Sequence, residues 1–148
     1  MRPSASYALL FTLNFSASAV QAQDYLSVAE GPAILYDAPS TQAKKLFVGS
    51  SYLPLEQVVS LSNWVKVRDS SGTMAWIEKQ ALSNKRFVVV TAAIALVRQT
   101  PDDATPIVFQ ARQQVALEWL ERTGTGWIKV RHTDGMIGYV SMTDVWGG

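Results

Sequence analysis

The chain reads Asn63-Trp64-Val65-Lys66-Val67-Arg68-Asp69-Ser70-Ser71-Gly72-Thr73-Met74-Ala75-Trp76-Ile77 in its first half and Gly126-Trp127-Ile128-Lys129-Val130-Arg131-His132-Thr133-Asp134-Gly135-Met136-Ile137-Gly138-Tyr139-Val140 in its second. The two stretches share their order of aromatic, basic and glycine residues at a distance of 63 residues. Further upstream, residues 25–28 correspond to 87–90 and residues 33–39 to 95–101, at a distance of 62. A period of about 60 residues is too long for a solenoid repeat and fits a small domain. The sequence therefore predicts two related domains in tandem.

The first 22 residues have the pattern of a secretory signal. Arg2 is the only charge before Asp24, a short apolar run covers residues 7–15, and small residues lead to Ala22. The apolar run is too short to span a bilayer. We expect a signal peptide at residues 1–22, cleaved near Ala22, and no membrane anchor after cleavage. An unprocessed tail is the alternative.

The composition excludes several classes of function. Cysteine is absent, so there is no disulfide, thiolate metal site or thiol nucleophile. Export without disulfides fits a periplasmic or secreted bacterial protein. Lys and Arg total 13 and Asp and Glu total 12, and Arg2 accounts for the difference. A nucleic-acid partner would call for a basic face, so we expect none.

Short alternating runs separated by turn residues predict an all-β chain. The expected strands cover residues 25–29, 33–36, 52–60, 64–68 and 73–77, and then 87–91, 95–98, 114–122, 127–131 and 136–140. Long loops are expected at residues 39–49 and 101–112, and single helical turns at 78–82 and 141–145.

The two predicted domains, residues 23–84 and 85–148, have no flexible linker between them. The apolar run at residues 87–90 follows the short polar segment 83–86 directly and must be buried. It closes the first fold, opens the second, or does both. In each case we expect the domains to be held close together.

Each hairpin loop ends in a glycine, Gly72 or Gly135, where a type I turn with a bulge needs a left-handed residue. This register and the two-residue period of a strand assign each side chain to a face. The inward side chains are Val65, Val67, Ala75 and Ile77, and Ile128, Val130, Gly138 and Val140. The outward side chains are Trp64, Lys66, Arg68 and Trp76, and Trp127, Lys129, Arg131 and Tyr139. The small Ala75 and Gly138 fit a tightly curved barrel.

The outward face has two interpretations. A cross-strand aromatic pair contributes roughly 0.5–1.5 kcal/mol beyond its burial, and a lysine beside a ring adds about 0.5–1 kcal/mol. Contributions of this size are enough to explain the presence of these residues, if they stabilise the hairpin or pack one domain on the other. The functional interpretation is a shallow aromatic groove for an extended peptide. Trp119 and Trp146, which have no aromatic counterparts in the first repeat, are either packing residues or a partner-facing patch.

The repeated motif resembles the bacterial SH3 family. It consists of Trp-Val/Ile-Lys-Val-Arg, a loop ending in Gly, Ala/Gly-Trp/Tyr-Ile/Val and a helical turn, preceded by the opening-strand pattern Ala33-Ile34-Leu35-Tyr36-Asp37-Ala38-Pro39. The match covers nearly all of residues 25–146. The resemblance implies two small SH3-like β-barrels and a binding role, often towards peptidoglycan or its peptides.

The resemblance also implies a set of binding residues. The positions that match the family's aromatic groove, together with the neighbouring lysines, are Tyr36, Trp64, Lys66, Trp76, Trp127, Lys129 and Tyr139. Arg98 takes the opening-strand position in the second repeat. The proline and tyrosine of proline-reading grooves are replaced by Glu78 and Ala81, and by Ser141 and Asp144. A polyproline ligand is therefore not expected.

Catalytic and metal-binding groups are missing from the pattern. His132 is the only histidine and lies beside a hairpin tip, which suits neither a catalytic triad nor a zinc site. We expect no enzyme activity, metal or cofactor.

The leading hypothesis is an exported binding protein for a cell-envelope ligand such as peptidoglycan peptide. The alternative is a protein–protein interaction or assembly subunit in the bacterial envelope. A third possibility is that the contact between the two domains consumes the outward aromatics.

Overall fold

The computed structural model of the chain describes Pro3 and residues 24–148. The predicted signal peptide at residues 1–22, with its cleavage point near Ala22, lies outside the described residues apart from Pro3. No helix in the described part of the chain is long and apolar enough to cross a membrane.

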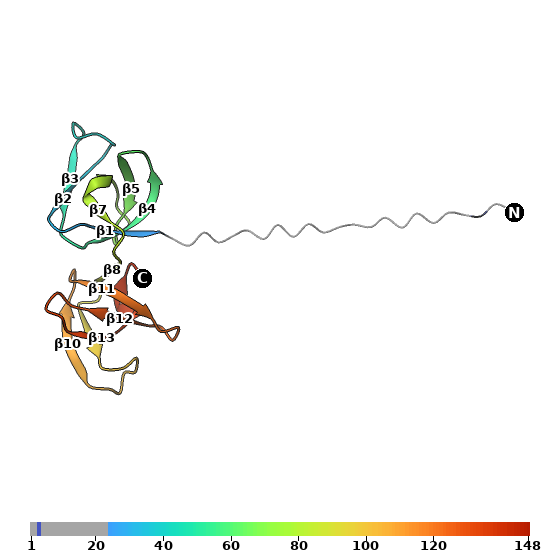
Figure 1. The fold of residues 1–148 in the computed structure, drawn as a ribbon, viewed down its shortest axis with the longest axis vertical. Helices are drawn as coiled ribbons and strands as arrows, with labels where there is room; N and C mark the ends of the chain where they lie inside the picture. Colours follow the sequence, from blue (N-terminus) through green and yellow to red (C-terminus); the bar gives the residue numbers. More distant parts are fainter. Residues whose placement is uncertain (1–2, 4–23) are drawn as a thin grey trace.

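Two antiparallel sheets of seven strands follow one another along the chain (Figure 1). The first contains β1 (Tyr25–Val28), β2 (Ala33–Tyr36), β3 (Lys45–Gly49), β4 (Pro54–Ser60), β5 (Trp64–Arg68), β6 (Met74–Glu78) and β7 (Leu82–Ser83). The second contains β8 (Phe87–Val90), β9 (Ile94–Arg98), β10 (Ile107–Arg112), β11 (Ala116–Arg122), β12 (Trp127–Arg131), β13 (Ile137–Ser141) and β14 (Val145–Trp146). Short 3-10 turns, η1 (Lys79–Ala81) and η2 (Met142–Asp144), precede the last strand of each sheet.

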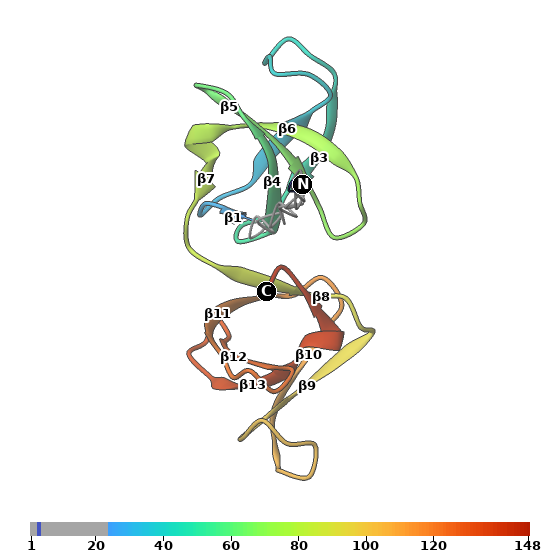
Figure 2. The ribbon, with the colours of Figure 1, turned by 90° about the vertical axis from the view of Figure 1, so that its right-hand side faces the viewer.

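The two sheets have the same topology, as the internal repeat predicts. The strand order is β3-β2-β6-β5-β4-β1-β7 in the first and β10-β9-β13-β12-β11-β8-β14 in the second. Each sheet curls around a core of its own (Figure 2). The prediction of an all-β chain with two repeated folds is therefore confirmed.

The predicted closed barrels are open sheets instead. Among the described residues, the end strands β3 and β7 do not pair with each other, and neither do β10 and β14. β7 and β14 are two residues long and pair with β1 and β8. In so short an antiparallel strand, the N–H and C=O of only about one residue face the free side, which is too little backbone to hold a barrel closed.

The repeated hairpins have the predicted register. Lys66 lies opposite Trp76 in the first repeat, and Lys129 lies opposite Tyr139 in the second. Gly72 and Gly135 have φ angles of 88° and 94°, the left-handed conformation that their loops require. All eight residues predicted to face inward are buried.

The structure corrects the two predicted long loops. The segments 39–49 and 101–112 each contain a strand, β3 and β10, which pair with β2 and β9. Each lies at the edge of its sheet and has one neighbouring strand. Its side chains therefore need not alternate between apolar and polar along the strand. Leu46 and Val48 of β3 are accordingly 39% and 64% exposed. Alternation, on which the sequence prediction depended, is therefore weak in these strands.

Strand β8 belongs to the second sheet, where it pairs with β11 and β14. All four of its residues are buried, although a strand has two faces. Val88 and Val90 belong to the core of the second repeat. Phe87 lies on the opposite face, where its ring stacks on Tyr52 of the first repeat at 4.8 Å and 17°. The strand is thus buried by its own sheet on one side and by the other repeat on the other.

The guanidinium of Arg86 joins the two repeats. It lies 5.3 Å from the ring of Tyr25 in the first repeat and 5.2 Å from that of Trp119 in the second. Its Nη2 also donates a hydrogen bond of 3.0 Å to the carbonyl oxygen of Gly147. Trp146 packs edge-on against Tyr25 at 5.3 Å. Both tryptophans that the first repeat lacks therefore belong to the boundary between the repeats.

Gly138 offers a test of how tightly the second core is packed. A Cβ at this position would lie 2.6 Å from Cγ1 of Val97 and 2.8 Å from the carbonyl oxygen of Arg98. Because the second contact is with backbone, we expect Gly138→Ala to lower the free energy of unfolding by about 1–3 kcal/mol. Urea denaturation measures this change, with the exposed Arg122→Ala as a control. Equal stability of the two variants would contradict the packing described here.

Arg86→Ala tests the contact between the repeats. The variant removes two cation–π contacts, each worth about 0.5–2 kcal/mol depending on exposure, so we expect a loss of about 1–3 kcal/mol in urea denaturation. Arg112→Ala, which removes an exposed arginine from the edge strand β10, is the matched control. A loss no larger than that of the control would show that Arg86 does not join the repeats.

Candidate functional site

The predicted aromatic residues of the first repeat lie on three neighbouring strands. Tyr36 ends β2, Trp76 lies in β6 and Trp64 begins β5. Tyr36 and Trp76 are direct partners across the strands, and the ring of Tyr36 meets that of Trp64 edge-on at 5.5 Å and 82°. Tyr36 is only 6% exposed. It therefore acts as a fixed support for the half-buried indole of Trp64.

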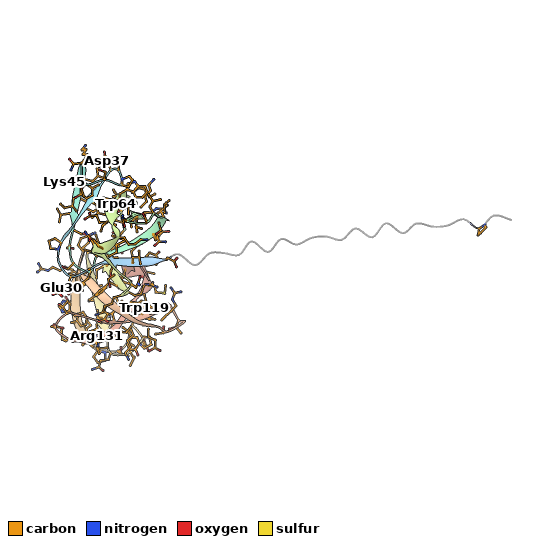
Figure 3. All side chains as sticks on the ribbon, turned by 45° about the horizontal axis from the view of Figure 1, so that its top comes forward. Glu30, Asp37, Lys45, Trp64, Trp119 and Arg131 are labelled. Atoms are coloured by element: carbon orange, nitrogen blue, oxygen red, sulfur yellow. The ribbon has the colours of Figure 1, made fainter. Side chains whose placement is uncertain are left out.

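A cleft of about 610 Å³ opens beside Trp64, whose position Figure 3 labels. Three segments that are distant in sequence form its walls: residues 39–41 after β2, residues 62–64 before and at the start of β5, and residues 78–80 at η1. The backbone N–H of Lys79 donates to the carbonyl oxygen of Asn63 at 2.9 Å, which ties two of these walls together. The cleft is thus framed by hydrogen-bonded turns.

The loop that forms the third wall is also tied down. The N–H of Asp37 donates to the carbonyl oxygen of Lys44 at 3.0 Å, and the N–H of Lys44 donates to Oδ1 of Asp37 at 3.1 Å. This pair closes the base of the loop that carries Pro39 and Ser40. The wall therefore has a defined position before any ligand arrives.

The lining of the cleft combines neutral hydrogen-bonding groups with one aromatic ring. The hydroxyl and amide side chains are Ser40, Thr41, Ser62, Asn63 and Gln80. Glu78 and Lys79 add one negative and one positive charge, which cancel. Such a surface suits a neutral or zwitterionic peptide, whose backbone needs donors and acceptors, with one apolar group placed against Trp64.

The other predicted binding residues do not line this cleft. In the first repeat, Tyr36 supports it from behind, and Lys66 and Trp76 lie beside each other on the outward face of the sheet. In the second repeat, Trp127, Lys129 and Tyr139 line neither this cleft nor the smaller cavity described below.

The second repeat has Arg98 in place of Tyr36. Tyr139 is the cross-strand partner of Arg98, as Trp76 is of Tyr36. The Nη1 of Arg98 donates to the carbonyl oxygen of Thr105 at 2.9 Å and so fastens the loop between β9 and β10. A residue that supports an indole in one repeat holds a loop in the other.

A smaller cavity of about 250 Å³ lies at the junction of the repeats. Tyr52 lines it from the first repeat, and the remaining lining residues, all from the second, are Lys85, Phe87, Glu118, Arg131, His132, Thr133 and Gly135. Figure 3 labels Arg131 and Trp119 on this repeat. This cavity was not predicted from the sequence, because it depends on Tyr52, a residue from outside the second repeat.

An acidic side chain organises the charges of the junction cavity. Oε2 of Glu118 accepts a hydrogen bond of 3.0 Å from Nε of Arg131, and Oε1 lies 3.5 Å from Nζ of Lys85. The hydrogen bond from Arg131 lowers the pKa of Glu118, burial opposes this effect, and Lys85 adds to the lowering. At neutral pH, the carboxylate is therefore ionised and holds both cations.

The predicted hairpin histidine borders the same cavity. Nδ1 of His132 lies 3.1 Å from Oδ1 of Asp134, which also accepts a hydrogen bond of 2.9 Å from the N–H of Met136. The backbone hydrogen bond is the main reason that the pKa of Asp134 is lowered. Within residues 24–148, no group of three or more histidines and carboxylates is placed to hold a metal ion.

Family comparisons agree with this architecture. Bacterial SH3 domain models match the chain twice, one over residues 29–84 and another over residues 95–145. The protein therefore belongs to the bacterial SH3 domain family and carries two such domains in tandem, which confirms the resemblance in the hairpin motif. No curated protein matches the chain.

Three solved structures are similar to parts of the chain at low identity. NlpC2 from Trichomonas vaginalis is 14% identical with a TM-score of 0.40, over 85% of this chain and 48% of that one. NlpC1 from the same organism is 16% identical with a TM-score of 0.40, over 93% and 50%. An NlpC/P60 family protein from Bacillus cereus ATCC 10987 is 15% identical with a TM-score of 0.39, over 82% and 55%. The chain thus spans about half the length of these structures.

Proposed function

We propose that this is a non-catalytic, exported binding protein whose first bacterial SH3 domain takes a cell-wall peptide, such as a peptidoglycan stem peptide, in the cleft beside Trp64. The cleft itself is the observation that carries the proposal. It combines a supported indole with five neutral hydrogen-bonding side chains, within a bacterial SH3 domain.

The chemistry of the cleft favours a peptide that is not rich in proline. Glu78 and Lys79 occupy the terminal turn, so the paired apolar slots that grip a polyproline helix are not completed there. The opposite charges of these two residues suit a ligand that carries both an amine and a carboxylate.

The export part of the proposal is supported by sequence. The charge, apolar run and small residues up to Ala22 have the order of a secretory signal. A periplasmic or secreted location would bring the cleft to the cell wall. The non-catalytic part is supported by the lack of cysteine and by the position of His132, the only histidine, at a hairpin next to Asp134.

A protein–protein interaction or assembly role is the second candidate, and the edge strand β3 favours it. Val48 and Leu46 are exposed on a strand whose one neighbour within residues 24–148 is β2. Edge strands with exposed apolar side chains add strands from partners readily. Crosslinking in the native host that captured one dominant envelope protein through β3 would favour this role over wall binding.

Trp64→Ala tests the proposed peptide site. We expect the variant to bind purified peptidoglycan sacculi about tenfold more weakly than the wild type in a sedimentation assay, because an aromatic anchor is removed. Trp127→Ala is the matched control, since Trp127 holds the equivalent position in the second repeat and does not line the cleft. Its binding should stay within about twofold of the wild type.

Two results would contradict the proposal. The wild-type protein would fail to sediment with sacculi at low salt, or the two tryptophan variants would lose binding equally. The second result would move the site away from the cleft, because only Trp64 lines it.

A further inference from the structure

We propose that the junction cavity is a second binding site, separate from the Trp64 cleft, for a small carboxylate with an apolar group next to it. A peptide C-terminus and a free organic acid share this chemistry. The site requires both repeats, because its aromatic floor comes from Tyr52 of the first and Phe87 of the second.

The aromatic floor is not explained by local structure. Tyr52 has a φ angle of 69°, a conformation that is unfavourable for a bulky residue. Gln114 occupies the equivalent turn of the second repeat with a φ angle of 72°. The turn therefore requires the left-handed backbone but not an aromatic ring. The ring of Tyr52 is accounted for by its stacking on Phe87, and both residues line the cavity.

The charges above this floor favour an anion. Lys85 and Arg131 contribute two positive charges to the lining, and Glu118 contributes one negative charge. The side chains of Lys85 and Arg131 are nevertheless 57% and 42% exposed. Nζ of Lys85 also lies 5.6 Å from the centre of the Phe87 ring, so a cation stands beside the aromatic floor.

Glu118 positions these cations without using all their donors. Within residues 24–148, Arg131 bonds to Glu118 through Nε. Its two terminal nitrogens, Nη1 and Nη2, have no hydrogen-bond partner there. A guanidinium presents its donors in a plane that matches a carboxylate. Glu118 therefore acts as a positioning residue, and the remaining donors of Arg131 and Lys85 would hold the incoming carboxylate.

The size of the cavity limits the ligand. Its volume of about 250 Å³ is below the roughly 300–1,000 Å³ of pockets for drug-sized molecules. One or two amino-acid residues, or a small aromatic acid, would fill it. The carboxylate would lie against Arg131 and Lys85, and the apolar part would lie on the rings of Tyr52 and Phe87.

The test uses NMR titration of the isotope-labelled protein at low salt with four probes: N-acetyl-alanyl-alanine, the same dipeptide with an amidated C-terminus, phenylacetate and inorganic phosphate. We expect the dipeptide acid to shift the backbone amide signals of Phe87, Thr133 and Gly135, and the amidated dipeptide to leave them unchanged. Shifts by phenylacetate as well would identify organic acids generally as the ligand, and no shift by phenylacetate would identify a peptide C-terminus. Equal shifts by both forms of the dipeptide, by neither, or equally tight binding of phosphate would overturn the proposal.

Matched variants assign the site to its residues. Arg131→Gln should weaken binding of the dipeptide acid at least fivefold, whereas Arg68→Gln should not, although Arg68 forms the corresponding ion pair with Glu56 in the first repeat. Tyr52→Gln installs the side chain that the second repeat carries at the same turn, and should weaken binding at least threefold with the fold retained. Trp64→Ala should bind like the wild type. Unchanged binding by both Arg131→Gln and Tyr52→Gln would overturn the proposal.

Discussion

The contact of Arg86 with rings from both repeats is the interaction on which the rest of the structure depends. A small domain of about 60 residues buries a limited core and gains stability from an interface. Arg86 lies between Tyr25 and Trp119 and reaches the carbonyl oxygen of Gly147. In the described part of the chain, its Nε is buried without a hydrogen-bond partner, so the ring faces supply most of the contact. The repeats are therefore held by flat, closely packed groups rather than by a tether.

This interface forms one of the two candidate sites. Phe87 and Tyr52 stack across the boundary, and Ser27 Oγ donates a hydrogen bond of 2.7 Å to the carbonyl oxygen of Lys85. The junction cavity exists only because these contacts bring the two repeats together. The cleft beside Trp64, by contrast, is built within the first repeat alone. The two sites thus depend on different parts of the fold.

The sequence predicted those features that depend on local alternation. The register of both hairpins, the left-handed Gly72 and Gly135 and the buried inward side chains follow from a period of two and from turn chemistry. The edge strands β3 and β10 did not follow, because exposed residues such as Val48 remove the alternation. Barrel closure was predicted wrongly, since two-residue strands give no signal in a sequence.

The candidate sites were predicted less completely than the fold. Trp64, which lines the cleft, was named from the family's motif, and Tyr36 was named because its position matches the opening strand. The junction cavity was missed, although the uninterrupted apolar run of β8 indicated a strand buried on both faces. What covered its second face was another repeat, and Tyr52 and Arg86 carry no pattern that shows this. Contacts between distant residues of unlike type leave little trace in a single sequence.

The central claim is that the two repeats form one rigid unit through Arg86 and its neighbours. Residual dipolar couplings of backbone N–H groups from both sheets test it most directly, because they report the orientation of each repeat in solution. The account predicts that one alignment tensor fits the couplings from residues 24–84 and 85–148 together. Two tensors of clearly different magnitude or orientation would show that the repeats move independently and would contradict it.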